Sequence, residues 1–146
     1  MNWKNEATEK LRHYDAMRQA LENIPMEIAR LESEARSIRS VRTDATPVKG
    51  GGCGREEILL NNLTQREQLR LRLEQTQAWV HTADRGLGVL SPEEKLILHR
   101  LFMYPERGAL DRLCSELGVE QSSIYRKRDR ALRRFTLALY GATEEL

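Results

Sequence analysis

The side chains with the clearest chemical role form a basic cluster near the carboxyl end of the chain. Six lysines and arginines fall within the nine positions 126–134, and only Asp129 opposes them. The net charge of the whole chain of 146 residues is only +2, so total charge by itself does not indicate a partner. Closely spaced cations neutralise the phosphates of nucleic acids. The cluster therefore predicts a polyanion-binding surface.

A helix-turn-helix is the element that would present this cluster to DNA. We expect a short helix from about Ala109, a turn at residues 117–119, and a basic second helix that ends at Gly141. Gly118 permits the left-handed backbone that ends the first helix, and Val119 fills the space between the two helices. The expected inward residues of the two helices are Leu110, Leu113, Cys114, Leu117, Ile124, Ala131, Leu132, Phe135 and Leu139.

The outward residues near the start of the second helix are candidates for reading DNA bases. When such a helix enters a major groove, Gln pairs with adenine, Arg with guanine or a phosphate, and Tyr with a thymine methyl. These base-reading candidates are Gln121, Ser122, Tyr125 and Arg126. The candidates for contacting the phosphate backbone are Ser123, Lys127, Arg128, Arg130, Arg133 and Arg134.

A further helix is strongly signalled just before this pair. Ser91 is a natural N-cap and Pro92 suits the first helical position, while Glu93 and Glu94 suit the positive end of the helix dipole. The segment 104–108 contains a proline and a glycine and should end this helix. Its expected apolar face comprises Leu96, Ile97, Leu101 and Phe102.

Two long helices are expected in the first ninety residues, over about 3–38 and 55–87, joined by a flexible loop at 43–54 that holds four of the nine glycines. Each helix would be roughly 50 Å long, so the two can pair antiparallel. Pro25 interrupts the first helix, which leaves a kink or two separate helices, and the unbroken phase favours the kink. The first stripe comprises Tyr14, Met17, Leu21, Ile24, Ile28, Leu31, Ala35 and Ile38, and the second comprises Ile58, Leu59, Leu63, Leu69, Leu73, Val80, Ala83 and Leu87.

These patterns predict an all-α fold class, since no alternation of apolar and polar residues persists anywhere. The expected domains are a long antiparallel helical hairpin at 1–88, a helix-turn-helix DNA-binding domain at 89–141 and a tail at 142–146. Two helices alone bury only one narrow strip of side chains. We therefore expect the chain to form a homodimer through the hairpin.

Composition and spacing argue against other classes of protein. No nucleophile and base are suitably arranged, and neither Cys53 nor Cys114 has a Cys or His neighbour at metal-ligand spacing, so we expect no enzyme, no cofactor and no metal. Both cysteines are expected to be reduced thiols. No apolar run approaches the roughly 18 residues that a membrane helix needs. We expect a cytoplasmic protein with no membrane contact.

The segments 90–102 and 113–135 together resemble region 4 of the bacterial sigma-70 factors. The whole layout is similar to the sigma-region-4-like regulators of phages, including the ArpU family of late packaging and lysis regulators. This resemblance implies a phage or prophage regulator in a bacterial host cell that binds double-stranded DNA near promoters and contacts RNA polymerase. It places the base-contacting positions on Gln121, Ser122, Tyr125 and Arg126. Glu120 departs from the pattern, since the family usually has Ser or Thr there and Glu caps a helix less well.

Two alternatives stay open beside a sequence-specific transcriptional regulator. A phage DNA-packaging adaptor similar to small terminase subunits also joins a helix-turn-helix to coiled helices, and a ring of many subunits would favour it. A sigma-like protein that binds RNA polymerase and no DNA is the other alternative. It predicts normal folding without salt-sensitive affinity for DNA.

Overall fold

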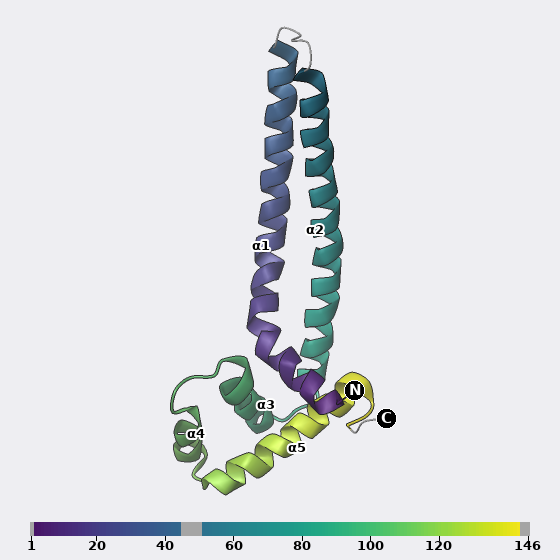
Figure 1. Ribbon diagram of the computed structural model, residues 1–146. Coiled ribbons are helices and arrows are strands. Elements are labelled where there is room, and N and C mark those ends of the chain that lie inside the picture. Colours follow the sequence, from purple (N-terminus) through teal and green to yellow (C-terminus); the bar gives the residue numbers. More distant parts are fainter. Residues whose placement is uncertain (1, 45–50, 144–146) are drawn as a thin grey trace. The chain divides into compact units, whose positions relative to one another are not determined.

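Helices make up nearly all of the protein. The computed structural model describes residues 2–44 and 51–143, and within these ranges it contains helices and turns but no strand. The expected all-α fold class is therefore confirmed. In chain order (Figure 1) the elements are α1 (Trp3–Asp44), α2 (Gly51–Gly88), α3 (Pro92–Leu98), the π-helical segment η1 (His99–Met103), α4 (Ala109–Leu117) and α5 (Gln121–Tyr140). Within the same ranges, no helix has both the length and the apolar character needed to cross a membrane.

The two long helices extend further than the sequence predicts. α1 includes Thr43 and Asp44, and α2 begins at Gly51, so the expected loop 43–54 is too long at both ends. Residues 45–50 of that loop lie outside the described residues. Glycine costs only about 1 kcal/mol per residue in a helix relative to alanine, which does not prevent a long helix from extending through it. α1 also continues through Pro25, so the alternative of two separate helices is wrong.

Packing divides the chain into two compact units, namely unit 1 (Met1–Arg18 with Ala78–Leu146) and unit 2 (Gln19–Gln77). This division differs from the domain boundary expected between residues 88 and 89. The physical reason is that parts of α1 and α2 pack against α5. The rings of Trp3 and Tyr140 lie 4.8 Å apart, and the backbone at Gly86 is so close to Phe135 that a Cβ there would meet the ring at 2.9 Å.

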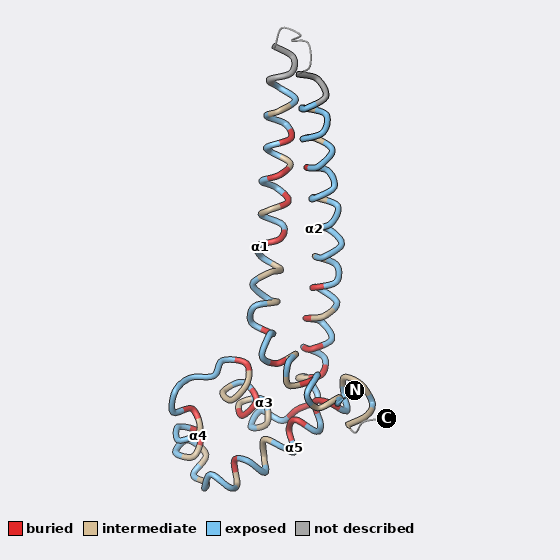
Figure 2. The backbone as a smooth tube through the Cα atoms, in the orientation of Figure 1, coloured by how far each residue is buried: buried red, intermediate tan, exposed pale blue. Residues whose placement is uncertain are grey.

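In unit 2, segments of α1 and α2 lie side by side and antiparallel (Figure 1). The face of α1 that was expected to be apolar is the buried one, which Figure 2 shows as a red stripe. Every predicted position of this face in unit 2 is buried or half-buried, namely Leu21, Ile24, Ile28, Leu31, Ala35 and Ile38. The alternating spacing of three and four residues thus identified the seam of α1 correctly.

The inner face of α2 in unit 2 differs from its expected stripe. Ile58 and Leu63 are exposed, at 52% and 39%, so their assignment to the seam is wrong. Asn62 and Thr76 are buried instead, at 5% and 4% exposure. Asn62 Nδ2 donates to the Leu31 carbonyl of α1 at 2.9 Å, and this hydrogen bond satisfies a polar group inside the seam. The apolar pattern failed here because the seam itself carries polar residues.

The core of unit 1 is apolar. Ile97, Leu113 and Ile124 are fully buried and bring α3, α4 and α5 together. The half-buried side chains packed against them are Leu96, Leu101, Leu110, Cys114, Leu117 and Val119. The expected faces of these helices are therefore confirmed except at Phe102, which is half-buried outside this cluster, and Leu98, which was not predicted, is also fully buried. The chain continues from α3 into the π-helical segment η1. Its turns are wider than those of an α-helix, so the apolar face of residues 96–102 rotates over its last residues.

Candidate nucleic-acid interface

The turn between α4 and α5 has the expected backbone. Gly118 ends α4 in the left-handed conformation, with φ 64° and ψ 37°, which a residue with a Cβ rarely adopts. The Val119 amide donates to the Cys114 carbonyl at 3.2 Å, and the half-buried Val119 side chain packs against the core. Glu120 precedes α5 as its N-cap without a side-chain hydrogen bond. Its expected weakness as a cap is thus confirmed.

One face of α5 is buried and fixes which side chains point outward. Ile124, Ala131, Leu132 and Phe135 are buried as expected, while Leu139 is half-buried. Thr136 is also fully buried, and its hydroxyl donates to the Leu132 carbonyl at 2.6 Å. The apolar pattern missed Thr136 because threonine can bury its hydroxyl when the helix backbone itself accepts the hydrogen bond.

The predicted base-reading residues are all exposed. Their neighbours differ, however. Gln121 Nε2 donates to a carboxylate oxygen of Asp111 in α4 at 3.3 Å, so this side chain is turned toward α4. The Tyr125 ring, at 42% exposure, lies under the guanidinium of Arg128 at 4.9 Å from its centroid. Ser122 and Arg126 lie one turn apart on the side of α5 opposite Ile124.

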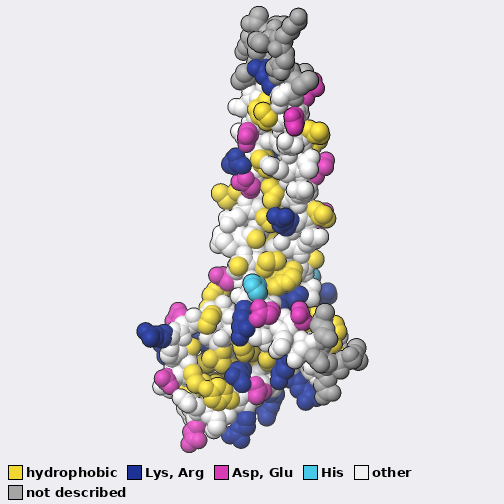
Figure 3. Space-filling model, viewed as in Figure 1, with side chains coloured by type: hydrophobic (Ala, Val, Ile, Leu, Met, Phe, Trp, Pro, Cys, Tyr) yellow, Lys and Arg dark blue, Asp and Glu magenta, His cyan; other side chains and the backbone are white. Residues whose placement is uncertain are grey.

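The predicted phosphate-contacting residues fall into two groups. Arg130 and Arg133 are exposed and continue the face of Arg126 at helical spacing. Among the described residues, none of these three arginines has an acidic partner. Figure 3 shows Lys and Arg side chains gathered where α5 lies in this view. We call the face formed by Ser122, Arg126, Arg130 and Arg133 the arginine stripe.

The other predicted phosphate contacts are engaged within unit 1 or less accessible. The Lys127 ammonium forms an ion pair with Glu93 of α3, and the Arg134 guanidinium forms one with Glu94. Arg128 pairs with its neighbour Asp129 at 3.0 Å. Ser123 is half-buried, so it is less accessible than the exposed arginines, and it carries no charge. The pairings of Lys127 and Arg134 with α3 span 34 and 40 residues and leave no local signal in the sequence, so the basic cluster by itself does not distinguish these two residues from the others.

Glu94 has two roles at the start of α3. Its backbone amide donates to the Ser91 hydroxyl at 3.2 Å, and its carboxylate accepts from the Ser91 amide at 3.1 Å, which completes the expected N-cap as a capping box. The same carboxylate pairs with Arg134. Burial raises the pKa of Glu94, but the Ser91 hydrogen bonds and the Arg134 charge outweigh burial and hold the pKa below its ordinary value.

Comparisons of the chain with models of protein families, with curated proteins and with solved structures find no match. The resemblance to sigma-70 region 4 therefore stays a prediction from the motif itself. The exposed arginines of α5, and the turn that positions this helix, are the features that favour a nucleic-acid interface.

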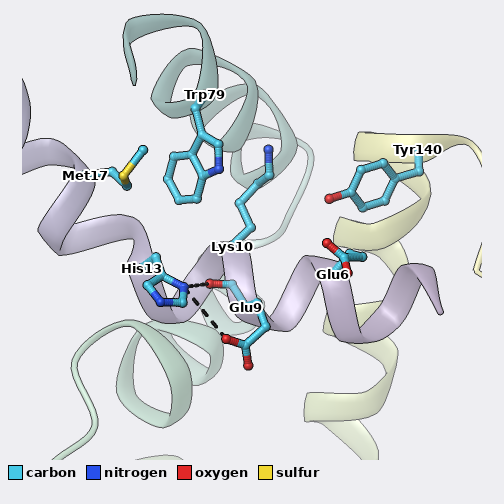
Figure 4. A pocket seen from close by; sticks show the side chains of 7 residues that line it. All are labelled: Glu6, Glu9, Lys10, His13, Met17, Trp79 and Tyr140. Atoms are coloured by element: carbon cyan, nitrogen blue, oxygen red, sulfur yellow. Dashed lines mark hydrogen bonds and ion pairs between the residues drawn. The ribbon is translucent and has the colours of Figure 1, made fainter. Parts of the chain in front are cut away.

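A separate hollow in unit 1 lies among α1, α2 and α5, and Figure 4 shows its lining. Lys10 Nζ lies 4.9 Å from the centroid of the Trp79 ring, which is a cation–π distance. Burial lowers the pKa of Lys10, and nearby Glu6 partly offsets this. Within the described residues, no group of three or more His, Cys, Asp or Glu side chains converges as metal ligands do. We interpret the hollow as packing between helix ends.

Proposed function

We propose that the chain is a sequence-specific DNA-binding transcriptional regulator. In this proposal α4 and α5 form a helix-turn-helix, and α5 is the recognition helix that enters the major groove. The resemblance to sigma-70 region 4 supports action at promoters together with RNA polymerase, in a bacterial host of a phage or prophage. α1 and α2 form the hairpin through which two copies associate.

The observation that carries the proposal is the arginine stripe. Its three guanidinium groups have no acidic partner among the described residues, and they follow one exposed helix face that also includes Ser122. Closely spaced cations with no internal counterion are favourable only when solvent ions or a polyanion neutralise them. A DNA backbone supplies phosphates at such spacing and releases counterions when it binds.

The geometry of the turn gives further support. α5 starts at Gln121, so the base-reading candidates lie in its first two turns, which is where recognition helices contact base edges. Arg126 is both near this end and part of the arginine stripe. It is therefore the side chain that we expect to combine base and phosphate contacts.

Exposed leucines on α2 support the homodimer within this proposal. Leu60 and Leu71 are exposed at 62% and 57%, and Leu63 lies at a helical position between them. Side chains of this kind on a helical hairpin are typical of contacts to another helix. We expect the second copy to cover them.

A binding selection tests the proposal. The purified chain is incubated with a pool of random duplexes at about 50 mM and about 200 mM salt, and retained sequences are read out. We expect an enriched motif that the double variant R126A/R130A loses. Arg107→Ala is the matched control, since Arg107 is also exposed but precedes α4. It should retain the motif.

Other outcomes would support the alternatives. Retention without any enriched motif, combined with a ring of many subunits by native mass measurement, would favour a packaging adaptor. Absence of salt-sensitive retention at both salt concentrations would contradict DNA binding, and recovery of RNA polymerase in a pull-down would then favour the polymerase-binding alternative.

A further inference from the structure

Two of the predicted phosphate contacts on α5 already have anionic partners in α3. Glu93 pairs with Lys127 and Glu94 pairs with Arg134. All four residues lie in unit 1 and line a common hollow, which Ser91 and Arg130 of the arginine stripe also line. The carboxylates occupy these cations in the same way that DNA phosphates would.

The two pairs differ in how firmly the fold holds them. The Glu94 side chain is only 13% exposed and belongs to the capping box, while Arg134 also donates to the Val89 carbonyl at 2.9 Å. Arg134 therefore links α5 to the start of α3. Glu93 and Lys127 are 43% and 34% exposed, and among the described residues each of these side chains pairs with the other alone. Such exposed pairs are weak because water competes for both charges.

We propose that Glu93 withholds Lys127 from DNA and so acts as a specificity-determining residue for the proposed DNA-binding function, on which this inference depends. A phosphate near Lys127 would meet the Glu93 carboxylate as well, and the repulsion cancels the attraction. The affinity of the protein for the DNA phosphate backbone then comes from the arginine stripe alone. Because backbone contacts strengthen binding to every sequence equally, removing one of them raises the share of affinity that depends on bases.

Arg134 has a different role. Its two interactions, with Glu94 and with the Val89 carbonyl, make it a positioning residue that holds α5 against α3. It does not contribute a phosphate contact. Of the six predicted phosphate contacts, Arg130 and Arg133 are the two that belong to the arginine stripe.

The test measures the affinity of the full chain for a random-sequence duplex over a series of salt concentrations. For Glu93→Gln we expect binding that is tighter by about two- to fivefold, the range that one exposed ion pair allows. The dependence of log K on log salt should steepen by about one unit, as one additional phosphate contact predicts. The double variant E93Q/K127Q should return to the slope of the unaltered protein.

Glu116→Gln is the matched control, since Glu116 forms an exposed ion pair with Arg100 at 3.3 Å and the substitution changes the net charge equally. It should leave the slope unchanged. Arg134→Gln should lower the melting temperature and also leave the slope unchanged.

Several outcomes would overturn the inference while leaving the proposed function intact. One is a slope of log K against log salt that is unchanged in E93Q, and another is an equal gain in duplex affinity in E93Q and E116Q. A steep slope that persists in E93Q/K127Q, or a flatter slope in R134Q, would also overturn it. If the unaltered chain and R126A/R130A both lack salt-sensitive binding to any duplex, the proposed function itself fails and this inference fails with it.

Discussion

In unit 1 the largest fully buried side chains are almost all apolar, and charged residues lie outside. In unit 2, Asn62 and Thr76 are buried in the seam while Leu60 and Leu71 are exposed. Unit 1 therefore closes its own core, although Val89 and Leu137 are exposed on its surface at 50% and 43%. Unit 2 holds its seam partly by hydrogen bonds and presents apolar side chains outward. The two units thus differ in their buried layers, since that of unit 1 is almost entirely apolar and that of unit 2 includes polar side chains, and we propose that a second copy covers the exposed leucines of α2.

The largest expected effect comes from removing a side chain of the unit 1 core. Phe135 is fully buried and contacts the backbone of α2 at Gly86. We expect Phe135→Ala to lower the free energy of unfolding by about 3–5 kcal/mol, because it removes an aromatic side chain and leaves a cavity. Denaturant titration followed by circular dichroism measures this. Exposed Leu137→Ala on the same helix is the control and should change stability by less than about 0.5 kcal/mol.

A smaller effect is expected in the seam of unit 2. Asn62→Ala removes the hydrogen bond to the Leu31 carbonyl and the acceptor that Arg66 Nε uses at 2.8 Å, and we expect a loss of about 1–2 kcal/mol. Asn62→Leu should recover this loss, because apolar side chains at seam positions stabilise paired helices more than polar ones. If the leucine variant were as unstable as the alanine variant, the polar seam of unit 2 would be as indispensable as the apolar core of unit 1.

The capping box of α3 gives a pH-dependent effect of intermediate size. The folded pKa of Glu94 is below its ordinary value, so its contribution to stability is present above that ordinary value and is lost as pH falls through the folded pKa. We expect Glu94→Gln to lower the free energy of unfolding by about 1 kcal/mol at neutral pH. The difference from the unaltered protein should shrink in acid.

Thermal melts at several pH values measure this difference. Glu106→Gln, which removes an exposed pair with Arg112, is the control and should show almost no difference at any pH. A constant gap between Glu94→Gln and the unaltered protein from neutral to acid pH would contradict the role of the ionised carboxylate.

Sequence patterns predicted the helices, the face of α1 from Tyr14 onward and much of the core of unit 1, because these depend on apolar periodicity and on local caps. They missed Ala7 and Leu11 of α1, which are fully buried in unit 1. The start of α3 at Ser91 and the turn at Gly118 are examples, since each is encoded within a few neighbouring residues. The patterns could not assign Asn62 to the seam, since its burial depends on a carbonyl 31 residues away. For the same reason they did not separate Lys127, which pairs with Glu93, from the stripe arginines, which have no acidic partner in the described part of the chain.

The smallest expected effect on stability concerns the exposed leucines of α2 in unit 2. Leu60 and Leu71 are mostly exposed, so replacing both with serine should change the stability of the single chain by less than about 0.5 kcal/mol. If these leucines contact a second copy, the same variant should weaken self-association, because the contact would lose the apolar area that drives it. Sedimentation over a range of concentrations measures the dimer directly.

Arg72→Ser, a change at an exposed site on the same helix, is the control and should leave self-association unchanged. Equal dimerisation of the leucine variant and the unaltered chain would place the contact elsewhere, and the exposed leucines of unit 2 would then require a different partner.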